Sequence, residues 1–323
     1  MNTATKLGGF GVGLAAVFAA ALGLGNATAA PESAPTTPPV HGGHAQSTRP
    51  ADADVHLPAG LQVTQDGYRL TPLSRELSTG APRAFRFQIA GPDGRPVTEY
   101  VTSHDKDLHL IVVRRDLSGF QHVHPRLAAD GTWSIPLAVP AAGQYRVFTD
   151  FRPAGLAEGL TLGADVPAPG EYRPVAMPAA ARSTSVDGYT VTLTGDLTAG
   201  RSSTLTLSVS KDGRPVTDLQ PYLGAYGHLV ALRDGDLAYL HVHPGGAPGD
   251  GRTKAGPKIV FHAEVPSAGA YRLYLDFQHA GKVRTAEFTV LTNGLSAAPA
   301  ATTATTARPS ESPAHDADGH THD

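Results

Sequence analysis

The sequence predicts an all-β protein with two tandem immunoglobulin-like β-sandwich domains and disordered N- and C-terminal segments. Three observations favour this class. Glycine and proline are abundant, with 36 and 27 residues among 323, which suits strands and turns better than helices. Apolar and polar residues alternate over several short stretches, and no stretch has the period of an amphipathic helix. The same pattern also occurs twice, in units of domain length.

The chain divides into six predicted segments. These are a signal peptide (1–29), a Pro/Ala/Thr-rich stalk (30–58), a first sandwich (59–166), a linker (167–182), a second sandwich (183–292) and a tail that ends in His and Asp (293–323). The first segment has a lysine, an apolar run and an Ala-Thr-Ala cleavage site, which predicts a secreted or cell-envelope protein. The alternative is an uncleaved membrane anchor. After cleavage, no transmembrane span is expected.

Strand signals recur in both halves. Residues 85–89 alternate between apolar and polar side chains, and residues 205–209 do the same. The turn sequence Asp-Gly-Arg-Pro-Val-Thr at 93–98 returns residue for residue at 212–217. Several short strands of this kind, separated by glycine-rich turns, are typical of a sandwich.

A histidine triplet occurs once in each half, with a separation of 119 residues at all three positions. The two triplets are His109, His122 and His124, and His228, His241 and His243. Most other residues differ between the copies, so the retained imidazoles indicate a ligand set for a transition metal. The alternative is structural, in which both copies inherited histidines that hydrogen-bond a loop.

Residues 109–124 predict a β-hairpin. If Val113 pairs with Phe120, then His109 faces His124 and Ile111 faces His122. Side chains two apart on a strand share a face, so the three imidazoles would form one compact triangle. We therefore expect about one metal ion in each repeat.

The fourth ligand of each site stays open, because no single residue is retained for it in both copies. Asp150 and Asp276 match each other, but we expect them to anchor a loop or to pair with Arg146 and Arg272. Further candidate ligands are His104, His262, His279, His315, His320 and His322.

The composition narrows the choice of metal. The chain has no cysteine, and Met177 is the only methionine after the signal segment, so Cu(I) lacks its preferred soft ligands. Imidazoles with oxygen or water suit Cu(II) or Zn(II). The net charge of -3 provides no basic field and argues against nucleic acid as a partner.

The hairpin sequences at 109–125 and 228–244 resemble those of exported bacterial β-sandwich proteins (YtkA-like and related domains). These proteins carry H-L-[IV]-V followed by F-x-H-x-H-P. The resemblance implies heavy-metal or copper handling. We therefore expect metal buffering, delivery or resistance, with metal ions and an envelope metal-handling protein as partners. A metal enzyme with an open coordination position and a non-metal interaction module are the alternatives, and no general acid or base motif favours the enzyme.

Overall fold

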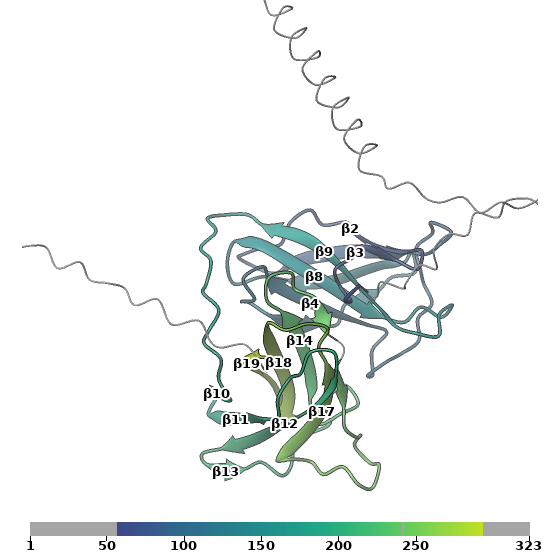
Figure 1. Ribbon diagram of the computed structural model, residues 1–323. Coiled ribbons are helices and arrows are strands. Elements are labelled where there is room, and N and C mark those ends of the chain that lie inside the picture. Colours follow the sequence, from purple (N-terminus) through teal and green to yellow (C-terminus); the bar gives the residue numbers. More distant parts are fainter. Residues whose placement is uncertain (1–56, 241, 293–323) are drawn as a thin grey trace, which may run out of the picture. The chain divides into compact units, whose positions relative to one another are not determined.

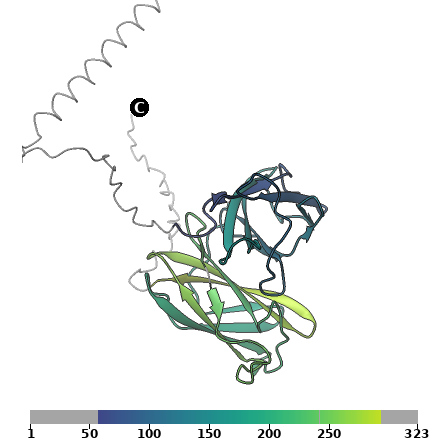
Figure 2. The same cartoon turned by 90° about the vertical axis from the view of Figure 1, so that its right-hand side faces the viewer.

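The structure, a computed structural model, describes residues 57–240 and 242–292 of the chain. Regular structure in this part consists of strands β1 to β19 and no helix, which confirms the predicted all-β class. Figures 1 and 2 show the strands of the first half in purple to teal and those of the second half in green to yellow. The predicted signal peptide, nearly all of the stalk and the tail lie outside the described residues.

The first half is a sandwich of two antiparallel sheets. One sheet has the order β1(Thr64–Gln65), β2(Tyr68–Pro72), β3(Arg83–Ala90), β7(Thr132–Leu137), β6(Arg126–Leu127). The other has the order β5(Gln121–Val123), β4(Leu108–Arg114), β8(Gly143–Phe151), β9(Leu160–Ala168).

The second half repeats this plan. Its first sheet has the order β10(Ser183–Val186), β11(Tyr189–Thr194), β12(Ser202–Lys211), β17(Lys258–Glu264), β16(Val242–Pro244), with β13(Arg214–Pro215) beside β12. Its second sheet has the order β15(Tyr239–Leu240), β14(His228–Arg233), β18(Ala270–His279), β19(Lys282–Leu291).

Each half has its own apolar core, built by the expected alternation. In β12, Leu205, Leu207 and Val209 are buried in the core of the second half, and the residues between them are more exposed. In β3, Phe85 and Phe87 do the same in the first half. The period of two along a strand sends alternate side chains to one face, which is why these stretches could be identified from the sequence.

Strand β4 departs from this alternation, because all seven of its residues are buried. Leu110 and Val112 face the core of the first half. Ile111 and Val113 point the other way, into a third apolar cluster that also contains Val230 of β14. We call this third cluster the inter-repeat junction; its buried members are Ile111, Val113, Leu117, Phe148, Val230, Leu232, Leu237, Tyr239 and Tyr274. Both sheets that contribute to it are therefore covered on two faces.

Aromatic contacts across the junction are reciprocal. Phe120 of the first copy stacks on Tyr274 of the second, with ring centroids 3.9 Å apart. Tyr239 and Phe148, the corresponding residues of the opposite copies, lie 5.6 Å apart. The same surface patch of each copy thus contacts its counterpart, as in an isologous dimer interface.

Candidate metal centre

Two of the histidines lie on the same strand faces as the apolar residues of the inter-repeat junction. His109 precedes Ile111 and Val113 on the outward face of β4, and His228 lies in the same row as Val230 on β14. Side chains two apart share a face of a strand. The two imidazoles are therefore carried to the end of the apolar junction, where both copies contribute.

The predicted hairpin register is confirmed on the pairs that the structure shows. Ile111 is the Cα partner of His122, and Leu110 and Val112 pair with Val123 and Gln121. Beyond the end of β5, His109 Nδ1 and His124 Nε2 lie 3.2 Å apart, as that register predicts. All three histidines of the first copy therefore lie on the face that β4 turns toward the junction.

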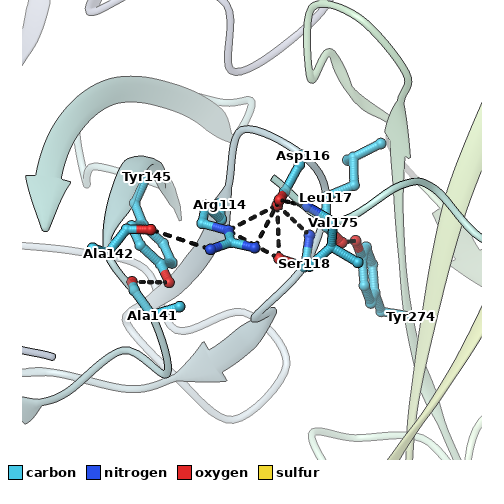
Figure 3. A network of polar contacts seen from close by, with 9 residues as sticks. All are labelled: Arg114, Asp116, Leu117, Ser118, Ala141, Ala142, Tyr145, Val175 and Tyr274. Atoms are coloured by element: carbon cyan, nitrogen blue, oxygen red, sulfur yellow. Dashed lines mark hydrogen bonds and ion pairs between the residues drawn. The ribbon is translucent and has the colours of Figure 1, made fainter. Parts of the chain in front are cut away.

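The loop of this hairpin is held by a polar network around Asp116 (Figure 3). Asp116 accepts hydrogen bonds from Arg114 Nε at 3.0 Å, Ser118 Oγ at 2.7 Å and the backbone N–H of Val175 at 2.7 Å. Burial alone would raise the pKa of this carboxyl, but these donors lower it overall. The network fixes the loop that places His122.

Nitrogen atoms of the first triplet converge on one point. His109 Nδ1 lies 3.0 Å from His122 Nε2 and 3.2 Å from His124 Nε2. His228 of the second copy stacks on His109, with ring centroids 5.4 Å apart and planes at 13°. One ligand atom from each of His109, His122 and His228 lies within 4.8 Å of the others.

Hydrogen bonds on the far sides of two rings determine which nitrogens carry protons. His109 Nε2 lies 3.1 Å from the carbonyl oxygen of Ser103, and His122 Nδ1 lies 2.8 Å from Asp276 Oδ2. Both oxygens only accept, so each of these nitrogens must be the donor. The opposite nitrogens, His109 Nδ1 and His122 Nε2, face each other at 3.0 Å, and one proton or one metal ion can lie between them. Outer hydrogen bonds of this kind are usual for metal-bound histidines.

The surroundings favour the neutral form of His109, His124 and His228. Burial, followed by repulsion from His122, lowers the pKa of His109 to about 4 and that of His124 to about 3. The same two causes, in the same order, lower the pKa of His228 well below its ordinary value. Only a neutral imidazole can donate its lone pair to a metal. At neutral pH these three imidazoles therefore have lone pairs available for a metal.

The second triplet does not assemble as expected. The hairpin keeps the same register, with Ala231 opposite Leu240, but the chain then leaves the sheet earlier than in the first copy. In the second copy β16 begins at Val242 and pairs with β17, so the exposed His243 becomes the Cα partner of His262. His241 lies outside the described residues.

The prediction of one site per repeat is therefore wrong for the described part of the chain. That part gathers one cluster of three or more potential ligands, His109, His122 and His228, and it draws on both repeats. The physical reason is the earlier crossing in the second copy. In the first copy the corresponding strand β6 starts only at Arg126, after the whole motif, so His124 stays beside His109.

The remaining candidate ligands have different surroundings. His104 is exposed, and its ring centroid lies 5.5 Å from that of His228 and 6.1 Å from that of His109. His262 lies on β17, 3.4 Å from Thr204 Oγ1. His279 Nδ1 forms a hydrogen bond with the Tyr189 hydroxyl at 2.6 Å. The tail residues His315, His320 and His322 lie outside the described residues.

Asp276 is the functional candidate that sequence reasoning placed wrongly. It accepts from His122 and, at 2.6 Å, from Thr285 Oγ1, instead of pairing with Arg272. Arg272 forms its ion pair with Glu287. The feature that could have revealed this contact is the position of Asp276, which pairs with His228 on the neighbouring strand. A carboxylate at that position shares the face of the histidine.

Comparison with known proteins gives a family but no activity. A family model described as a domain of unknown function (DUF8832) matches residues 62–168 and 184–294. The tandem match agrees with the duplication, and the resemblance to YtkA-like domains stays a prediction. No curated protein matches the chain.

Solved structures that are similar have low identity. A Salmonella alpha-2-macroglobulin mutant is 13% identical, with a TM-score of 0.25, and the match covers 72% of this chain and 15% of that one. The D0-D1 domain of intimin is 13% identical, with a TM-score of 0.19 and coverage of 69% and 97%. Invasin, a bacterial integrin-binding protein, is 12% identical, with a TM-score of 0.19 and coverage of 72% and 41%.

Proposed function

Because the chain belongs to a family whose function is not known (DUF8832), we propose its function from the site alone: it binds one Cu(II) or Zn(II) ion. The ligands are His109, His122 and His228, with His124 beside them. The observation that carries the proposal is the convergence of one ligand atom from each of His109, His122 and His228, which lie within 4.8 Å of one another. The outer nitrogens of His109 and His122 are held by hydrogen bonds to oxygen acceptors, so the nitrogens that face each other at 3.0 Å are the ones available to an ion.

The distances suit a late transition metal. Two nitrogens bound to one tetrahedral ion at roughly 2.0–2.1 Å would lie about 3.4 Å apart. The observed separations of 3.0 and 3.2 Å need only a small expansion to accept the ion. An all-imidazole set without thiolate suits Cu(II) and Zn(II), and copper binds such ligands more tightly.

Metal buffering, delivery or resistance in the cell envelope is the role we infer. The pattern of residues 1–29 supports export, and a second envelope metal-handling protein would be the natural partner. No helix within 57–240 and 242–292 is long and apolar enough to cross a membrane. Sandwich domains at 59–166 and 183–292 would then act together, because the site takes residues from both.

Titration with Zn(II) and with Cu(II) tests the proposal. The purified chain should bind one tight equivalent, and His228→Ala should weaken this binding although the change lies in the second copy. His262→Ala, which removes an exposed imidazole from β17, serves as the matched control and should bind normally. If the double variant His109→Ala/His122→Ala still bound the tight equivalent, this site would not be the metal centre.

A further inference from the structure

The site has an exposed neighbour on a two-residue turn. Ser103 N–H donates to Lys106 O at 2.8 Å, and Lys106 N–H donates to Ser103 O at 3.1 Å. His104 and Asp105 between them have φ values of 48° and 62°. Two successive positive values are the signature of a type I′ turn, which glycine and asparagine normally occupy.

This turn is attached to the site. The carbonyl oxygen of Ser103 accepts from His109 Nε2, so the turn is tied directly to a candidate ligand. The His104 ring meets those of His228 and His109 edge-on, at 81° and 69°. Its ring nitrogens are not among the three ligand atoms that lie within 4.8 Å of one another. His104 thus lies next to the site, one step further out.

Exposure separates His104 from the ligands it touches. His109 is 4% exposed and the His122 side chain 1%, and His124 is half-buried, whereas His104 is exposed. An ion that reaches buried imidazoles must exchange its bound waters for nitrogen in steps. An exposed imidazole beside them can supply the first nitrogen.

The second copy shows that the turn itself does not need a histidine. Leu223 takes the place of His104 with φ 55°, and Tyr222 and Ala225 bond to each other as Ser103 and Lys106 do. Leu223 is 4% exposed. The backbone conformation is therefore kept with a buried leucine, and the exposed imidazole is a separate feature of the copy that carries the site.

We propose that His104 is the exchange ligand of the metal centre, through which the ion enters and leaves. It binds the incoming ion through one ring nitrogen in place of water and passes it to His228 and His109, without a change of oxidation state. On release the order is reversed. This inference rests on the proposed metal-binding function.

The test measures the rates of Zn(II) uptake and release separately from the affinity for Zn(II). His104→Asn removes the imidazole but suits a residue with positive φ, and His104→Gly removes the strain as well. Uptake of Zn(II) by the whole chain and its removal by a chromophoric chelator would be followed by stopped-flow absorbance. Both rates should fall by about tenfold in both variants, equivalent to about 1.4 kcal/mol of barrier, with the dissociation constant unchanged. His262→Asn should exchange at the wild-type rate.

Three results would overturn the proposal. Unchanged rates in both variants would show that His104 takes no part in exchange. A faster release with weaker binding would show that it is a resting ligand instead. If only His104→Asn slowed exchange, the turn conformation would be responsible and not the imidazole. A wild-type chain without tight Zn(II) binding would instead remove the proposed function, and this inference with it.

Discussion

Replacing Asp276 with asparagine should weaken metal binding without touching any ligand. Asp276 accepts the Nδ1 proton of His122 at 2.8 Å and is itself held by Thr285 Oγ1 at 2.6 Å. The carboxylate fixes the tautomer that leaves the lone pair on His122 Nε2, toward the site. An amide has nearly the same shape, but it is a weaker acceptor and can also present its NH₂ group. His122 then loses both charge stabilisation and a defined orientation.

The magnitude follows from burial. The His122 and Asp276 side chains are 1% and 4% exposed, so water screens their interaction little. Loss of such a hydrogen-bond partner behind a ligating histidine typically lowers metal affinity by about 10- to 100-fold. This corresponds to about 1.4 to 2.7 kcal/mol of binding free energy. We expect Asp276→Asn to fall in this range for Zn(II).

Competition with a chelator of known affinity measures this change. Asp165→Asn is the control, because Asp165 is a carboxylate on β9 that forms ion pairs with Arg146 at 3.0 Å and Arg115 at 2.6 Å. Its loss should leave the affinity for Zn(II) near the wild-type value. Equal affinities for Asp276→Asn and the wild type would refute the tautomer argument.

Two further perturbations test the apo-protein. The pKa of His109 is lowered to about 4 in the folded state, against about 6.5 unfolded. The contribution of His109 to the free energy of unfolding is therefore complete above pH 6.5, and it falls by about 3 kcal/mol near pH 4 as the unfolded chain takes up protons. Urea unfolding at pH 4 and above pH 6.5 should show this loss in the free energy of unfolding, and the variant His109→Gln should lose less. Tyr274→Phe removes the donor to the Leu117 carbonyl at 2.6 Å, which should cost about 1–3 kcal/mol; an unchanged melting temperature would contradict the role of this bond in holding the hairpin loop.

The duplication, the strands and the hairpin register were predictable because they depend on local patterns. Alternation fixes which side chains share a face, and it led from Val113 opposite Phe120 to Ile111 opposite His122. The unbroken apolar run from Leu110 to Val113 also indicates what kind of strand β4 is. An unbroken apolar strand is buried on both faces, so the outward face of β4 had to be covered.

The alternation of apolar residues does not show what covers the outward face of β4. The cover is the equivalent face of the other copy, which brings His228 and Asp276 to the histidines of the first copy. The early crossing of β16 was equally hidden, because His-Val-His-Pro reads the same in both copies. Strand exchange between sheets depends on pairing with β17, and a motif shared by both copies does not reveal that pairing.

The reciprocal junction also explains why one ion per chain is the physically reasonable outcome. His109 and His228 occupy equivalent positions in the two copies, and their rings stack 5.4 Å apart. A second triplet assembled around His228 would therefore compete with the first for the same place. In the described structure the second copy avoids this conflict, because β16 carries His243 to the other sheet and leaves His228 free to complete the site of the first copy.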